Sequence, residues 1–190
     1  MRNIITIAVV VAVGAWFFLG NSGNANNVDL GRVLDRAQTS LQTFQTHMTK
    51  QNVQKVTDDH LKALSGLMRD AMNTEPPVHT GPVGVNLLKD SKFEGFADAN
   101  QDNVKDAGEE RLFTLELDFD GKRLIASDGT GTSTGMGMGT GILAGMLMGH
   151  LLSNQRAAGI QQGHFANRNV QSRSNYARSS TRSGGRFGGK

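Results

Sequence analysis

The spacing of apolar residues predicts two amphipathic helices near the start of the main body of the chain. In the first helix the apolar side chains recur at intervals of four and three residues and form one stripe: Leu30, Leu34, Ala37, Leu41, Phe44 and Met48. A second helix should begin at Thr57, a good N-cap, with Asp58 and Asp59 in its first turn, and should end before Pro76-Pro77. The stripe is too short to specify a coiled coil, so we expect the two helices to pack together as an intramolecular hairpin.

From Leu112 onward the period of the apolar pattern changes from helical to alternating. Phe113, Leu115, Leu117 and Phe119 alternate with polar residues, which is typical of a β-strand with one buried face. Asp120-Gly121 then predicts a hairpin turn of type I′ before a second strand over residues 122–127. Residues 83–88 are a candidate third strand. The pattern therefore predicts an α+β body over residues 28–128.

Residues 98–109, between the helices and the hairpin, carry oxygen side chains at the spacing of a metal-binding loop. The potential ligands are Asp98, Asn100, Asp102, Asp106 and Glu109, with the carbonyl of Val104. Ca²⁺ takes six to eight oxygen ligands, and a loop of this spacing can wrap around one ion. The alternative is that these residues form only solvated turns.

The stretch resembles the calcium loop of EF-hand proteins, and also the related Asp/Asn-rich loops of secreted bacterial modules, over 12 of 190 residues. The resemblance implies Ca²⁺ binding through the five oxygen-bearing side chains, to which the carbonyl of Val104 can be added. Two positions depart from the EF-hand pattern: Asn103 replaces a glycine, and Lys105 replaces an aliphatic residue. A strand rather than a helix is expected to follow Glu110. We therefore expect a single loop with a structural or weak Ca²⁺ site.

Residues 1–20 form an apolar head that we expect to enter a membrane. Residues 4–19 are uncharged, Arg2 precedes them, and Trp16, Phe17 and Phe18 close the run. The run is longer than the apolar core of most cleaved signals and slightly shorter than a full span of about 17–25 residues. Two interpretations stay open: a retained signal anchor with an aromatic interfacial end, or a signal peptide removed after Ala25.

A glycine-rich apolar stretch over residues 135–152 predicts a second membrane helix. Gly137, Gly141, Gly145 and Gly149 recur every four residues, which would align them on one helical face. Such a face lets another helix approach closely in a bilayer, whereas in water each interior glycine costs about 1 kcal/mol. The stretch resembles the glycine-zipper segments of membrane proteins and implies a homo-oligomer. A flexible Gly/Met linker is the alternative.

The charged residues also divide the chain into an acidic middle part and a basic tail. The net charge of +3 combines Arg2 in the head, 12 basic and all 17 acidic residues between residues 20 and 134, and seven basic and no acidic residues after them. Residues 153–190, rich in Arg, Ser and Gly, should be disordered because little apolar surface is available to bury. Residues 184–189 resemble Gly/Arg-rich RNA-binding segments, and anionic lipid is the favoured alternative partner. The candidate anion-binding residues are Arg168, Arg173, Arg178, Arg182 and Arg186.

These features together predict a non-enzymatic protein of the bacterial cell envelope. The chain contains no cysteine, and the G-x-S-x-G pattern at residues 131–135 lacks the following acidic residue that a hydrolase triad needs. The favoured arrangement places the protein in the cell inner membrane, with an extracytoplasmic body between two membrane segments that contact the lipid bilayer. The alternative is a periplasmic or secreted protein whose basic tail binds an acidic surface of lipid, polysaccharide or nucleic acid.

Overall fold

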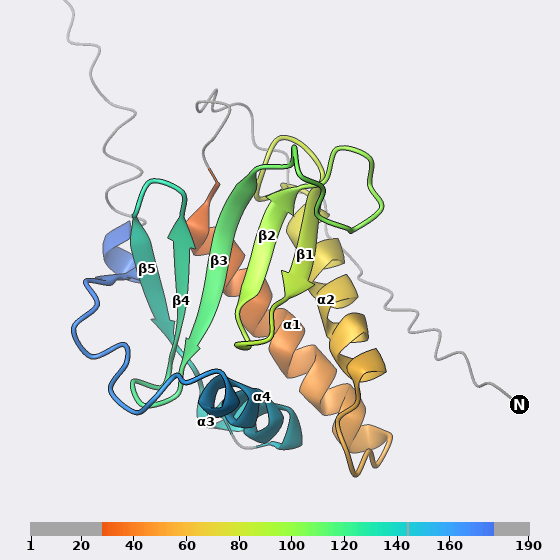
Figure 1. Cartoon of the computed structure of the whole chain (residues 1–190), viewed down its shortest axis with the longest axis vertical. Helices are drawn as coiled ribbons and strands as arrows, with labels where there is room; N and C mark the ends of the chain where they lie inside the picture. The colour runs from red at the N-terminus through yellow and green to blue at the C-terminus, as the bar shows by residue number, and fades with distance from the viewer. Residues whose placement is uncertain (1–27, 144, 177–190) are drawn as a thin grey trace, which may run out of the picture.

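The fold is a helical layer packed on one face of a β-sheet (Figure 1). The computed structural model describes residues 28–143 and 145–176. The elements in chain order are α1 (Leu30–Lys50), α2 (Asp58–Asn73), β1 (Val83–Leu87), β2 (Phe93–Ala97), β3 (Arg111–Asp118), β4 (Arg123–Asp128), β5 (Ser133–Gly137), α3 (Thr140–Leu143), α4 (Met146–Ala157) and β6 (Gln171–Ser172). The predicted α+β class is confirmed.

The sheet contains its six strands in sequence order, from β1 at one edge to β6 at the other. Neighbouring strands are antiparallel except β5 and β6, which are parallel. α1 and α2 cover one face, which we call the helix face (Figure 1). There Phe44 and Met68 from the helices join Phe113 and Leu117 from β3 in one buried core. The opposite face is called the outer face below.

The helical hairpin forms as its pattern predicts. Thr57 is the N-cap of α2, and the stripe along α1 is buried in the core. Arg36 of α1 donates hydrogen bonds to the carbonyl oxygens of Ala71 and Met72 at 2.7 and 2.9 Å, so it caps the C-terminal end of α2. Burial lowers the pKa of Arg36. This contact ties the two helices together at the end where the chain turns toward the sheet.

The predicted strands at 112–119, 122–127 and 83–88 are confirmed as β3, β4 and β1, but the turn between β3 and β4 differs. Positive φ occurs at Lys122, with a value of 50°, and not at Asp120 or Gly121 as a type I′ turn requires. The backbone nitrogen of Gly121 donates to the Asp118 carboxylate at 2.8 Å. A Cβ at Gly121 would lie 2.4 Å from that carboxylate, so close approach explains this glycine.

The prediction of one helix over residues 135–152 is wrong. The stretch contains the end of β5, the short helix α3 and the first half of α4. β5 pairs with β4, which supplies partners for backbone groups that a membrane helix would satisfy internally. Within residues 28–143 and 145–176, no helix is both long and apolar enough to cross a bilayer.

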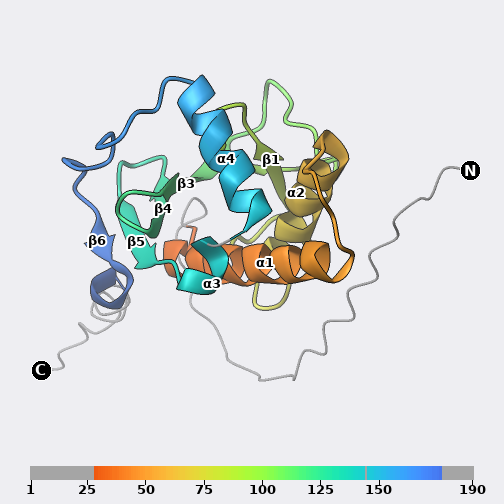
Figure 2. The same ribbon diagram turned by 90° about the horizontal axis from the view of Figure 1, so that it is seen from below.

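α4 crosses one end of the sheet, from the side of α1 to the outer side (Figure 2). Two hydrogen bonds fix it there: Ser91 Oγ donates to the carbonyl of Leu151, and Gln155 Nε2 donates to that of Leu117, both at 2.9 Å. Both polar side chains are buried. The glycine-rich stretch is therefore part of the α+β body.

The body also extends beyond the predicted boundary at residue 128. α4 continues to Ala157, and residues 161–172, called the strap below, run over the outer face and end in β6. The prediction of disorder is therefore wrong for residues 153–176. The head at residues 1–20 and the tail cations Arg178, Arg182 and Arg186 lie outside the described residues.

Candidate functional site

The predicted calcium loop, residues 98–109, lies between β2 and β3 and extends past the edge strand β1 (Figure 1). Two side chains of the loop attach it to the sheet. Asn103 Oδ1 accepts a hydrogen bond from the backbone nitrogen of Val85 at 3.0 Å, and Lys105 Nζ contacts Glu94 Oε1 at 2.9 Å. The two residues that depart from the EF-hand pattern are thus the ones that attach the loop to β1 and β2.

Asn103 explains how the loop turns without a glycine. Its φ is 59°, in the left-handed region that asparagine tolerates better than most residues. Glycine would adopt this conformation more easily but could not reach Val85. The side-chain role of Asn103 was not predictable from the loop sequence, because its partner lies 18 residues earlier in the chain.

Backbone N–H groups of the loop hold one oxygen of most candidate ligands. Asp98 Oδ2 accepts from Asn103 at 3.0 Å, and Asp102 Oδ1 accepts from Val104 at 2.7 Å. Asn100 Oδ1 accepts from the nitrogen of Asp102 at 3.2 Å. The Glu109 carboxylate spans the loop and accepts from Ala99 at 2.9 Å and from Asp106 at 3.0 Å. The candidate ligands are therefore oriented by the backbone of their own loop.

The remaining oxygens are less well satisfied. Asp98 is 2% exposed, and its Oδ1 has no hydrogen-bond partner among the described residues. Asn100 Nδ2 lies 3.0 Å from Asp102 Oδ2 and 3.1 Å from Asp106 Oδ2. The neutral amide of Asn100 thus lies between two carboxylates, and the Oδ1 atom of Asp98 is buried without a hydrogen-bond partner among the described residues. Burial of an unpaired carboxylate oxygen costs free energy that a cation would offset.

The donor types fit a hard cation, but the side chains are not arranged as a finished coordination shell. In the part of the chain that the structure describes, no three His, Asp or Glu side chains are grouped closely enough to hold a metal ion. Both Glu109 oxygens are engaged by N–H groups, and the Asn100 amide separates Asp102 from Asp106. Ca²⁺ binding would therefore require the side chains of Glu109 and Asn100 to exchange their present hydrogen-bond partners for the ion.

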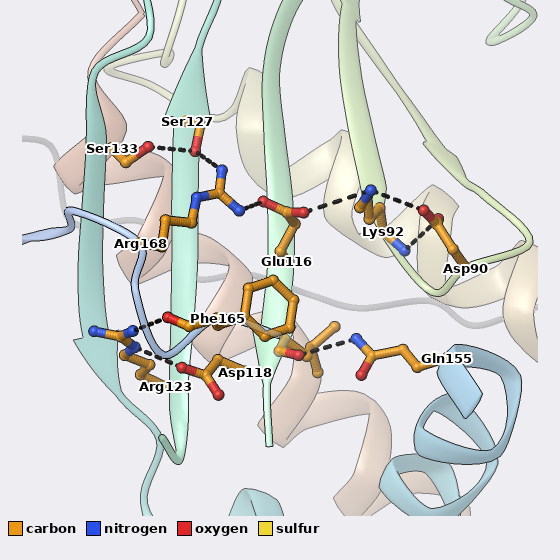
Figure 3. A network of polar contacts seen from close by, with 11 residues as sticks. Asp90, Lys92, Glu116, Asp118, Arg123, Ser127, Ser133, Gln155, Phe165 and Arg168 are labelled. Atoms are coloured by element: carbon orange, nitrogen blue, oxygen red, sulfur yellow. Dashed lines mark hydrogen bonds and ion pairs between the residues drawn. The ribbon is translucent and has the colours of Figure 1, made fainter. Parts of the chain in front are cut away.

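A second polar cluster lies on the outer face and involves the strap (Figure 3). Glu116 of β3 is buried, and its carboxylate contacts both Arg168 and Lys92, the latter at 3.5 Å. Arg168 also donates to Ser127 Oγ at 2.9 Å. A hydrogen bond to Asp90 raises the pKa of Lys92. The cluster neutralises a buried carboxylate and fixes the strap above β3 and β4.

A neighbouring ion pair between β3 and β4 gives the strap a second attachment to the sheet. Arg123 Nε lies 2.7 Å from Asp118 Oδ2, and its guanidinium donates to the carbonyl of Phe165 at 3.3 Å (Figure 3). Phe165 is 5% exposed and lies on the outer side of the sheet. The strap thus supplies both apolar and ionic contacts.

Two of the five predicted anion-binding arginines lie among the described residues, and both pair with carboxylates of the chain itself. Arg168 pairs with Glu116, and Arg173 pairs with Asp35 of α1. Both carboxylates lie far away in sequence, so counting charge by segment could not reveal that these cations have partners within the chain. These pairs reduce the charge that the tail can offer to another molecule.

The four glycines predicted to share one helical face are not brought together. Gly137 lies in β5, Gly141 in α3, Gly145 before α4 and Gly149 inside it. A Cβ at Gly149 would meet nothing within 4 Å, whereas one at Gly145 would lie 2.3 Å from the side chain of Gln45. Gly145 therefore allows a close approach to α1, which differs from a repeated helix-packing face.

No protein-family model, curated protein or solved structure matches this chain.

Proposed function

We propose that this protein is a non-enzymatic Ca²⁺-binding protein of the cell envelope, in which the loop 98–109 binds one ion and stabilises the edge of the sheet. The observation that carries the proposal is Asp98, whose Oδ2 is held by the nitrogen of Asn103 while its buried Oδ1 has no partner among the described residues. A cation is the species that would satisfy such an oxygen.

The charge of the loop supports this proposal. Four carboxylates lie within the loop, and Lys105, its only basic residue, contacts Glu94 outside it. The ligands would be the side-chain oxygens of Asp98, Asn100, Asp102, Asp106 and Glu109 together with the carbonyl of Val104. Bound Ca²⁺ would neutralise much of the mutual repulsion of the carboxylates.

The consequence of binding would be structural. Asp98 holds the nitrogen of Asn103, and Asn103 in turn holds the nitrogen of Val85 on the edge strand β1. An ion that fixes Asp98 would therefore also fix the contact between the loop and the sheet. An edge strand with covered N–H groups is protected against unwanted strand pairing.

Hydrogen exchange in the full-length protein tests this role. Ca²⁺ should slow exchange of the Val85 amide and raise the midpoint of thermal unfolding, because binding to the folded state stabilises it. Asp102→Asn should reduce both effects, whereas Asp70→Asn, a matched charge change on the exposed face of α2, should preserve them. Equal responses from the two variants, or no response of the parent protein, would contradict the proposed role.

The envelope location rests on the apolar run at residues 4–19, which lies outside the described residues. A retained anchor would leave the full N-terminus on the mature protein, whereas a cleaved signal would give a new terminus at Asn26. N-terminal sequencing distinguishes these two cases. Labelling of Thr43→Cys, an exposed site on α1, by a membrane-impermeant maleimide in intact cells tests whether the body is extracytoplasmic. Absence of labelling despite reaction in lysed cells would exclude that location.

A further inference from the structure

The outward edge of β1 is covered along only part of its length. Pro82 and Leu88 form backbone hydrogen bonds with Asp98 and Lys92 at 3.0 and 2.8 Å, so even-numbered residues bond toward β2. In an antiparallel pair the intervening residues direct their N–H and C=O groups away from that partner. The backbone N–H and C=O groups at the free edge are therefore those of Val83, Val85 and Leu87.

Side chains cover both backbone groups of Val83 and the N–H of Val85. Asn73 accepts from the Val83 nitrogen at 2.9 Å and donates to the Val83 carbonyl at 2.8 Å, as a neighbouring strand would. Asn103 accepts from the Val85 nitrogen. No described side chain bonds to the backbone of Leu87, so strand pairing remains open at this end of β1.

A groove of about 770 Å³ lies at that open end, between α2, the end of β1, the loop and α4. Its apolar lining includes Leu61, Leu88 and Val104. Leu88 is 38% and Val104 is 59% exposed, and Met146 is the only other large apolar residue exposed to this degree among those described. The groove thus combines exposed apolar surface with open backbone groups.

Two of the three charged residues in the groove lining are basic, which favours an acidic ligand. Lys62 and Lys89 line the groove, and neither forms an ion pair in the described part of the chain. Asp58 is the one acidic residue in the lining. The basic tail of the chain has no acidic residue after Asp128, so it lacks the complementary charge.

We propose that this groove binds an extended acidic peptide segment of another protein, which adds to β1 as an extra strand. The peptide backbone would pair with the N–H and C=O of Leu87, its apolar side chains would contact Leu88 and Val104, and its carboxylates would face Lys62 and Lys89. The inference rests on the proposed function only in that a Ca²⁺-bound loop would fix Val104 in the groove wall.

Fluorescence anisotropy with the full-length protein tests the proposal. The probe is a fluorescein-labelled peptide of five Glu-Val repeats, compared with Lys-Val repeats and with a Glu-Val peptide N-methylated at every Val. The Glu-Val probe should bind, the Lys-Val peptide should bind at least about tenfold more weakly, and N-methylation should weaken binding about fivefold or more by removing backbone donors. Equal binding of all three peptides, or no binding, would overturn the proposal.

Variants then locate the site. Lys62→Glu with Lys89→Glu should weaken Glu-Val binding about tenfold or more, whereas Lys50→Glu with Lys55→Glu, the same charge change outside the groove lining, should have a much smaller effect. A dimer dispersed by the first pair of substitutions, without peptide binding, would assign the groove to a second copy of the chain and overturn the proposal. Repeating the titration with Ca²⁺ and with EDTA separates the two hypotheses. Peptide binding without any Ca²⁺ effect would refute the role of the ion and preserve the groove.

Discussion

The side-chain oxygen of Asn103 lies 3.0 Å from the backbone nitrogen of Val85, and this hydrogen bond joins the candidate calcium loop to the edge of the sheet. The same residue adopts a φ of 59°, which the loop needs in order to turn. Its own nitrogen donates to the Asp98 carboxylate. Asn103 thus connects the most buried candidate ligand with β1, which makes the loop both a candidate metal site and a cover for an edge strand.

Substitutions at Asn103 separate its two roles. Asn103→Gly should lose about 1 kcal/mol of unfolding free energy, because it removes the hydrogen bond to Val85 but keeps the turn. Asn103→Ala should lose about 2 kcal/mol, since alanine also resists positive φ. Urea unfolding in EDTA measures both values. An alanine variant as stable as the glycine variant would mean that backbone conformation is not limiting here.

The ion pair between the strap and the sheet should contribute more than an exposed pair of the same type. Arg168→Met leaves the buried Glu116 with Lys92 alone and should cost about 2 kcal/mol, with faster hydrogen exchange across residues 161–172. Arg173→Met, whose partner Asp35 is 48% exposed, should cost about 0.5 kcal/mol. Urea unfolding compares the two variants. The reverse order of losses would contradict this account of the strap.

Lys92 should give stability a specific alkaline dependence. Its pKa in the folded protein is raised above 10.5, chiefly by the hydrogen bond to Asp90 and also by Glu116. The stabilisation is therefore complete below that value and is lost as pH rises through the higher folded-state pKa. Lys92→Met should cost about 1 kcal/mol at neutral pH, and its difference from the parent protein should shrink in alkali.

Unfolding of both proteins at neutral pH and above pH 10.5 measures this difference. Lys62→Met is the control, because Lys62 forms no ion pair among the described residues. A difference that grows with pH for Lys92→Met would show that the sign of the effect is wrong.

Two glycines should respond in opposite ways to replacement by alanine, and the response of Gly149 tests whether another helix packs against α4 at that position. Gly149→Ala should raise the unfolding free energy by about 0.5–1 kcal/mol, since its Cβ would meet nothing and alanine favours the helix. Gly95→Ala should lower it by about 2 kcal/mol, because its Cβ would lie 2.2 Å from the Phe113 ring. Marked destabilisation by Gly149→Ala would instead indicate a close helix partner at that glycine.

The helices and the central hairpin could be predicted because their signals are local. Thr57 caps α2 within one turn, and the alternation in β3 follows from a single buried face. β5 could not be predicted, since Gly135 and Gly137 lack the branched side chains of typical strands and their four-residue spacing with later glycines imitates a helix face. Pairing with β4 determines its structure instead.

The candidate site was predictable only in part, because some of its contacts join residues that are far apart in the sequence. The spacing of Asp98, Asn100 and Asp102 identifies the loop, but the attachment of Asn103 to Val85 depends on the fold. Glu116 and Arg168 are 52 residues apart, so their contact has no local signal. The charge of the tail by itself therefore suggests an external partner, whereas Arg168 and Arg173 pair inside the protein.

The most direct test of the central claim is calorimetric titration of the full-length protein with Ca²⁺, beside Asp98→Asn and the surface control Asp70→Asn. We expect one Ca²⁺ per chain for the parent and for Asp70→Asn, and loss of the binding heat in Asp98→Asn, because Asp98 would supply the buried oxygen of the site. The same heat from all three proteins, or the absence of binding heat from the parent together with no Ca²⁺-dependent stabilisation, would contradict it.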